Sequence, residues 1–181
     1  MKRTISIPLV AVFLVAAIAA VAGCGGGDTS KARADVSQAD ALYKSIATDS
    51  NQLASKITAA TASLADRSKL RVSINGLNAF LDSMDKKADE AKADYAKVKS
   101  LKGADKYVTY ADMQMRLMDL IKQATAMLKS FMAEIFTAAS SGDAAKVQSL
   151  QTQFETQFNN LTSEITKQEN AAAKYKSDNN L

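Results

Sequence analysis

The sequence contains no histidine and no tryptophan among its 181 residues, and it has one proline and one cysteine. Without histidine, the chain has no means to build a histidine general base, a serine–histidine triad or a histidine-ligated metal or haem site. Aromatic residues make up only 6% of the chain, whereas alanine is abundant. Because helix breakers are scarce and helix formers are common, the composition favours long α-helices.

An excess of charge of one sign is also lacking. The formal net charge is +4, and it falls to +2 without Lys2 and Arg3 at the extreme N-terminus. The remaining lysines alternate with acidic residues, and no aromatic residues are interleaved with them. A basic patch with aromatic stacking positions is typical of nucleic-acid-binding proteins. We therefore expect no nucleic-acid partner.

The N-terminal segment has the parts of an export signal. Two positive residues precede a run of apolar or small residues from Ile5 to Ala22. A charged start, an apolar stretch and small residues at its end are typical of a secretory signal peptide. The run is also long enough to span a bilayer if it stays uncleaved. Both arrangements keep the positive residues on the cytoplasmic side and export the rest of the chain.

The single cysteine lies at the end of this segment, where an exported protein has no second thiol to pair with it. The stretch Val21-Ala22-Gly23-Cys24 resembles the lipobox of bacterial lipoprotein precursors. The resemblance covers residues 1–24 and implies cleavage before Cys24, a diacylglyceryl thioether on it and an acyl chain such as palmitate on its new amino group. Two or more acyl chains anchor a protein stably in a membrane. The alternative is an ordinary secretory leader with an incidental cysteine.

We expect the chain to divide into three parts. Residues 1–23 are the signal peptide, residues 24–31 are the lipidated cysteine and a flexible Gly-rich tether, and residues 32–181 are the helical domain. The residue after the cysteine is Gly25 rather than aspartate, and in such lipoproteins this implies the outer membrane of a two-membrane envelope. In an envelope with one membrane, the protein would sit on its outer face.

Four segments with helical apolar spacing follow the tether, at about residues 32–63, 67–101, 105–139 and 143–176. Apolar residues recur in them at alternating steps of three and four, which indicates a bundle or coiled-coil seam. In the second segment these residues are Leu70, Ile74, Leu77, Leu81, Met84, Ala88, Ala91, Tyr95 and Val98. No stretch alternates with period two, so we expect no strands.

The breaks between the segments are short. They lie at Asp66, at Gly103–Asp105 and at Ser140–Asp143, and they offer glycine for a helix end and aspartate or serine for the next N-cap. Short loops make neighbouring helices antiparallel. We therefore expect an all-α fold, an antiparallel up-down-up-down four-helix bundle of long, coiled-coil-like helices.

This topology brings the tyrosines to the membrane-proximal end of the bundle. They are Tyr43, Tyr95, Tyr107, Tyr110 and Tyr175. Tyrosine suits a place that is apolar on one side and wet on the other. The cluster is therefore either a pocket or docking surface near the anchor, or the terminal core layers of the bundle with hydroxyl groups that reach solvent.

The third segment has an unusually wide apolar surface. A candidate partner surface consists of Met113, Met115, Met118, Leu120, Met127 and Met132. Methionine is favoured where a surface must adapt to varied partners. The alternative is a core helix packed between two neighbours. Met115 and Met118 also have the spacing of a Cu(I)-binding pair, but the other segments offer few further ligands.

An acidic run in the second segment is the remaining candidate for metal binding. Its acids Asp82, Asp85, Asp89, Glu90 and Asp94 are interleaved with Lys86, Lys87 and Lys92. This pattern is typical of a solvated helix face with compensating ion pairs rather than a calcium site. We expect no metal, no cofactor and no enzymatic activity.

The leading functional prediction is a membrane-anchored lipoprotein that acts as a protein-interaction or scaffold module of the cell envelope. Its partner would be an envelope protein or a second copy of the chain. The alternative is a ligand-binding bundle for an apolar or aromatic small molecule, similar to the four-helix sensor domains of bacterial receptors. An exposed Met/Leu stripe on the third helix would favour the partner, and a cavity lined by tyrosines would favour the ligand.

Overall fold

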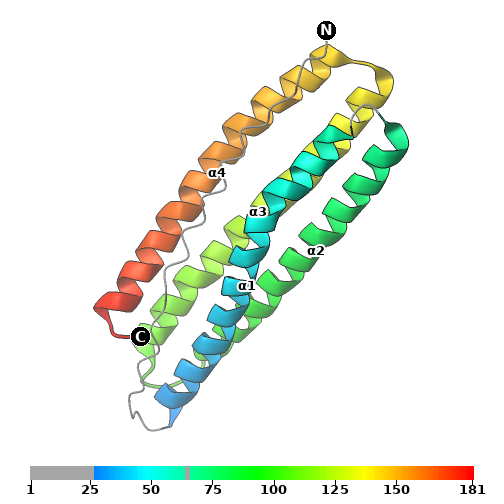
Figure 1. Ribbon diagram of the computed structural model, residues 1–181. Coiled ribbons are helices and arrows are strands. Elements are labelled where there is room, and N and C mark those ends of the chain that lie inside the picture. The colour runs from blue at the N-terminus through cyan, green and yellow to red at the C-terminus, as the bar shows by residue number, and fades with distance from the viewer. Residues whose placement is uncertain (1–26, 64–65) are drawn as a thin grey trace.

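The computed structural model describes residues 27–63 and 66–181, which form four α-helices in up-down-up-down order (Figure 1). Helix α1 spans Asp28–Ala62, α2 spans Arg67–Val98, α3 spans Asp105–Ser141 and α4 spans Ala144–Asp178. The predicted fold class is confirmed, and these residues contain no strand. The predicted signal peptide, the lipobox and Cys24 lie outside the described residues.

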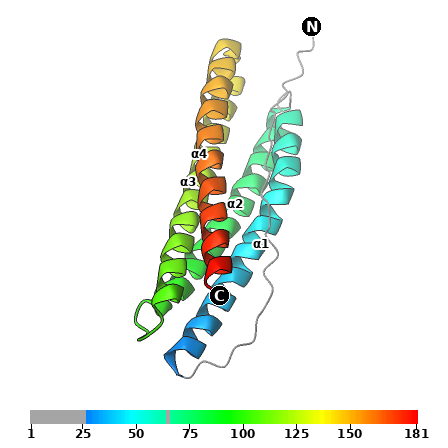
Figure 2. The same cartoon turned by 90° about the vertical axis from the view of Figure 1, so that its left-hand side faces the viewer.

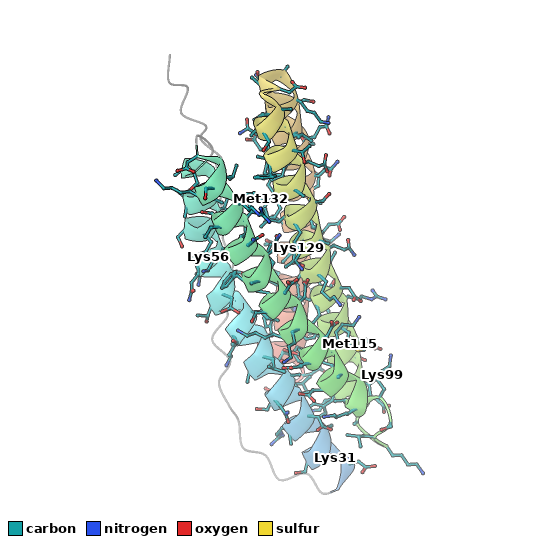
Figure 3. All side chains as sticks on the ribbon, turned by 90° about the vertical axis from the view of Figure 1, so that its right-hand side faces the viewer. Lys31, Lys56, Lys99, Met115, Lys129 and Met132 are labelled. Carbon is teal, nitrogen blue, oxygen red and sulfur yellow. The ribbon has the colours of Figure 1, made fainter. Side chains whose placement is uncertain are left out.

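Consecutive helices pack side by side along the bundle, and α3 also touches α1. Within the described part of the chain, the backbones of α1 and α4 do not pack on each other. Figures 2 and 3 show the α1–α2 hairpin separating from the α3–α4 hairpin toward one end, where the tip of the α3–α4 hairpin projects further. We call this the distal end. The opposite end, with the start of α1, the α2–α3 turn and the end of α4, is the basal end.

The apolar seam predicted from the sequence forms the core. In α2, every residue of the predicted seam is buried, from Leu70 to Val98. Helices α1 and α3 contribute matching rows, whereas only Phe154, Leu161, Ile165 and Ala172 of α4 are buried. Helix α4 is therefore a peripheral helix, and it packs on α3 along a single row. None of the helices in the described ranges has an apolar stretch long enough to cross a bilayer.

Helix α1 begins earlier than the sequence predicted. Residues 28–31, expected in the flexible tether, form its first turn. The carboxylate of Asp28 accepts a hydrogen bond of 3.1 Å from the backbone N–H of Lys102, which joins the start of α1 to the α2–α3 turn. An acidic side chain in the first turn also interacts favourably with the helix dipole. Only residues 25–27 therefore separate Cys24 from α1 in the sequence.

Most of the predicted helix ends are confirmed. The side chain of Asp66 caps α2, the side chain of Asp143 caps α4, and Gly142 ends α3 with a φ of 75°. One cap prediction is wrong, because the N-cap of α3 is Ala104, which forms no side-chain cap bond. Asp105 is instead the first helical residue, where its charge still lies next to the positive end of the helix dipole.

The acidic run of α2 pairs mainly with other helices. Lys129 of α3 donates to Asp82 at 2.7 Å and to Asp85 at 2.6 Å, and Lys122 of α3 pairs with Asp89. Local pairing, as the sequence predicted, is found for Lys86 with Glu90. Most of these charges are half exposed, so they align α2 and α3 more than they stabilise them. Among the described residues, no group of three or more acidic, histidine or cysteine side chains is placed to hold a metal ion.

Two glycines provide a matched test of the helix boundaries. Gly142 has the left-handed φ of 75°, whereas Gly76 lies inside α2, and a Cβ at either position would meet nothing within 4 Å. Gly142→Ala should destabilise the bundle by about 1–2 kcal/mol, because an L-residue is strained in the left-handed region. Gly76→Ala should stabilise it by about 0.5–1 kcal/mol through helix propensity. Urea unfolding of the two variants measures both effects, and a shift of the same sign in both would contradict these boundaries.

Candidate functional site

A buried polar cluster at the basal end receives side chains from all four helices. At its centre is Asp40 of α1, which is only 4% exposed. The hydroxyl of Tyr95 from α2 donates to Asp40 Oδ1 at 2.6 Å, and that of Tyr110 from α3 donates to the same atom at 3.0 Å. Lys176 Nζ from α4 donates to Asp40 Oδ2. A buried carboxylate is costly unless it is paired and hydrogen-bonded, and here three donors satisfy it.

A second layer of contacts surrounds this carboxylate. The rings of Tyr95 and Tyr110 meet edge to face, with centroids 6.3 Å apart, and the Lys176 ammonium lies 5.1 Å from the Tyr110 ring centroid. Gln114 Nε2 donates to the Tyr110 hydroxyl at 2.7 Å. The other amide atom, Gln114 Oε1, is buried without a hydrogen-bond partner among the described residues. The layer fixes the orientation of Tyr110 toward Asp40.

A second hydrogen-bonded link between α1 and α4 lies near Asp40. The hydroxyl of Tyr43 on α1 donates to the carboxylate of Glu169 on α4. Burial raises the pKa of Glu169, and the hydrogen bond from Tyr43 partly opposes that rise. Because the backbones of α1 and α4 do not pack, the bonds of Lys176 and Tyr43 hold the two helices together here. We call these residues the Asp40 cluster: Asp40, Tyr43, Tyr95, Tyr110, Gln114, Glu169 and Lys176.

The tyrosines of the cluster act as hydrogen-bond donors. Burial raises the pKa of Tyr95 and of Tyr110, and the negative charge of Asp40 raises both further. Burial also raises the pKa of Tyr43, together with its hydrogen bond to Glu169. These hydroxyl groups therefore stay protonated near neutral pH, and none of them is suited to act as a general base.

The structure brings part of the predicted tyrosine set together. Tyr43, Tyr95 and Tyr110 belong to the Asp40 cluster, and the hydroxyl of Tyr107 accepts a hydrogen bond of 3.2 Å from Arg33 Nε. Tyr175 is half-buried against the core. The apolar spacing and the tyrosine positions did not predict the other four members of the cluster, Asp40, Gln114, Glu169 and Lys176. The available signal was a charged residue directly beside a seam position, such as Asp40 after Ala39.

The hydroxyl groups of the clustered tyrosines bond to polar side chains. A shallow, open depression of about 500 Å³ lies between α1 and α2, lined by Gln38, Ala41, Leu42, Glu90, Ala93 and Asp94. No tyrosine is among the residues that line it. The depression therefore differs from the tyrosine-lined cavity that would favour an aromatic ligand.

The candidate partner surface on α3 is not an exposed stripe. Met118 and Met132 are fully buried in the core. The other four members are half-buried and pack against the core: Met113, Met115, Leu120 and Met127. Two of the six residues are therefore hidden in the core, and the other four are only partly exposed. Of the possible Cu(I)-binding pair, Met118 is therefore buried in the core and Met115 is half-buried against it.

The position of α3 explains its wide apolar surface. On one side, Thr125 and Lys129 of α3 bond to Asp85 of α2, and Figure 3 shows Met115, Lys129 and Met132 along this α2–α3 seam. On the other side, Gln168 of α4 donates to the backbone oxygen of Met113 at 2.8 Å. Further along this side, the ring of Phe131 stacks on Phe154 of α4 at 4.1 Å. Helix α3 is thus a core helix packed between two neighbours.

The buried ion pair of the cluster can be tested against an exposed one on the same helix. Lys176 and Asp40 have side-chain exposures of 13% and 6%, whereas Lys174 and Asp178 have 76% and 56%. Lys176→Met should lower the free energy of unfolding by about 3–5 kcal/mol, because it leaves a buried carboxylate without its counter-charge. Lys174→Met should change it by no more than about 1 kcal/mol. Similar losses in both variants, measured by urea unfolding, would show that Asp40 does not depend on Lys176.

Glu169 predicts a pH-dependent effect. Its pKa is raised in the folded state, so folding favours the protonated carboxyl group. As the pH rises above the unfolded pKa of about 4.3, the unfolded state ionises first and the folded protein loses stability relative to it. Glu169→Gln keeps an acceptor for Tyr43 and removes the buried charge. The variant should therefore be more stable than the parent at pH 7, and the difference should shrink as the pH falls through about 4. Glu164→Gln, at an exposed position of α4, is the matched control in unfolding experiments across this pH range. A less stable Glu169→Gln variant at pH 7 would mean that the charged hydrogen bond outweighs the cost of burial.

No family model matches this chain, and comparison with curated proteins and with solved structures gives no significant match. A function can therefore be inferred only from the side chains of this protein and their contacts. The described residues provide a hydrogen-bonded cluster at the basal end and a core that contains the apolar faces of all four helices.

Proposed function

We propose that the protein is a lipid-anchored, non-enzymatic scaffold or protein-interaction module of the cell envelope. One observation carries the proposal: α1 begins only four residues after Cys24. With Cys24 acylated, the basal end lies at the membrane and the bundle extends from it. At a rise of about 1.5 Å per residue, a helix of the length of α3 reaches roughly 55 Å. Such a body can hold a partner at a fixed distance from the bilayer.

The properties of the side chains support a non-enzymatic role. The tyrosines, Asp40 and Lys176 bond to one another, and burial keeps the tyrosine hydroxyls protonated. An acid–base catalyst instead needs a group that titrates near the operating pH and can reach a substrate. The Asp40 cluster therefore fits a structural role in the bundle.

The distal end is where a partner would bind. The tip of the α3–α4 hairpin extends past the end of α1 and the start of α2 (Figure 2), and Phe136, Val147 and Leu150 near this tip are half-buried. Val72, close to the same end of α2, is 70% exposed. Partly exposed apolar side chains suit contact with another envelope protein or with a second copy of the chain.

With Gly25 after the cysteine, we place the anchor in the outer membrane of a two-membrane envelope, or otherwise on the outer face of the cell membrane.

A second candidate function is the binding of a small molecule between the helices. It is favoured by Gln114 Oε1, a buried acceptor without a partner among the described residues. The same side chain bonds to Tyr110 of the Asp40 cluster. A ligand with an aromatic part and one hydrogen-bond donor would match this environment. It would bind at the Asp40 cluster, in contrast to a protein partner at the distal end.

Native mass spectrometry of the full-length protein, extracted gently from its own envelope, tests the proposal. We expect the loss of residues 1–23, added acyl mass on Cys24, and a co-migrating protein or second copy. Cys24→Ser should carry no acyl mass, because serine provides no thiol for the thioether. An unmodified N-terminus in the parent protein would contradict the anchor. An acylated monomer that retains a small mass would favour the ligand-binding alternative, and a bare acylated monomer would contradict the interaction role.

A further inference from the structure

The basal end carries more exposed lysines than exposed acids. Within residues 27–35, 97–106 and 174–181, the exposed lysines are Lys31, Lys97, Lys99, Lys102, Lys106 and Lys174. The exposed acids in the same ranges are Asp28, Asp105 and Asp178. Figure 3 shows Lys31 and Lys99 at this end of the bundle, from α1 and from the turn after α2. The surface thus has an excess of ammonium groups on its solvent side.

Of these six lysines, three already form ion pairs and three are available to an external anion. Lys97, Lys99 and Lys174 pair with Asp94, Asp112 and Asp178. By contrast, Lys31, Lys102 and Lys106 form no ion pair with another described residue. The ammonium group of Lys106 donates to the backbone oxygen of Asn179, which keeps the start of α3 next to the end of α4. The hydrogen bond between Asp28 and Lys102 joins the start of α1 to the same surface.

The short tether decides what lies opposite this surface. Four peptide units separate Cys24 from Asp28, and fully extended they span at most about 14 Å. The polar headgroup layer of one leaflet is itself roughly 5–8 Å thick. An acylated Cys24 therefore holds the basal lysines within about one Debye length of the headgroups, which is about 8 Å at physiological ionic strength. The distal end lies many Debye lengths from the headgroups, so the charge of the headgroups is screened there.

We propose that the basal end is a docking surface for anionic phospholipid headgroups, on which the bundle stands upright. The proposal depends on the lipid anchor proposed above and adds a second contact with the membrane. Lys31, Lys102 and Lys106 lie against headgroup phosphates, because juxtamembrane lysines are attracted to anionic lipid. Since these lysines come from α1, the α2–α3 turn and α3, their simultaneous contact fixes the tilt of the rod. The acyl chains alone would leave it free to lean.

Lysine acetylation tests this orientation directly. Protein that carries its acyl chains is inserted into preformed phosphatidylcholine vesicles, with or without phosphatidylglycerol, and treated with a membrane-impermeant acetylating reagent. Peptide mass spectrometry then gives the rate at each lysine. We expect Lys31, Lys102 and Lys106 to react several-fold more slowly on the anionic vesicles, whereas Lys69 and Lys146 at the distal end react equally on both. The difference should disappear at 1 M salt, where the Debye length is about 3 Å.

Two triple variants with the same change in charge provide the control. The basal variant combines Lys31→Gln, Lys102→Gln and Lys106→Gln, and the distal variant combines Lys69→Gln, Arg71→Gln and Lys146→Gln. All of the replaced side chains are exposed, so both variants should fold. Slower acetylation of Lys174 on anionic vesicles should be lost in the basal variant and kept in the distal one. Loss in both would point to net charge rather than a docking surface, and would overturn the proposal.

Failure of the anchor and failure of the docking surface give different results. Flotation of the parent protein with pure phosphatidylcholine vesicles tests the anchor, because these vesicles have no net charge. If the protein does not float with them, the anchor is refuted and the docking surface with it. If it floats but the basal lysines react at equal rates on both kinds of vesicle, only the docking surface is refuted.

Discussion

The carboxylate of Asp40 is buried, and a buried charge must have partners close at hand. Its partners come from the three other helices, as Tyr95 of α2, Tyr110 of α3 and Lys176 of α4. The helix backbones otherwise pack mainly in sequence order, α1 on α2, α2 on α3 and α3 on α4, with a smaller contact between α1 and α3. The requirement to satisfy one carboxylate therefore draws α4 toward α1 at the basal end. Apolar packing alone is non-directional and does not specify this closure.

The helices and their seam could be predicted from the sequence, because they depend on local features. Spacing by three and four marks the buried row whatever the neighbouring helix is, as the row from Leu70 to Val98 shows. Asp66, Gly142 and Asp143 mark helix ends through their own backbone and side-chain chemistry. The start of α1 was misplaced because Asp28 is held by Lys102, a contact over a long sequence distance.

The Asp40 cluster could be predicted only in part, because its bonds connect residues far apart in the chain. Tyrosine positions along antiparallel helices place them at one end, but Glu169 and Lys176 resemble ordinary surface charges in the sequence. The position of Asp40 after the seam residue Ala39 suggests burial without identifying its partners. The width of the apolar surface of α3 was informative in a different way. It indicates two neighbours, and only the arrangement of α2 and α4 around α3 shows that both belong to the same chain.

The two ends of the bundle differ in how their hairpins are held together. At the basal end, a separation of α1 from α4 would break the Asp40–Lys176 pair and the bond from Tyr43 to Glu169. At the distal end, the contacts of α4 are apolar, with Phe154 stacked between Phe131 and Phe158. These rings hold α4 on α3 within one hairpin, and no buried ion pair among the described residues joins α4 to α1 there. If Cys24 carries the proposed anchor, the end without a buried link between α1 and α4 lies away from the membrane, where the proposed partner would reach it.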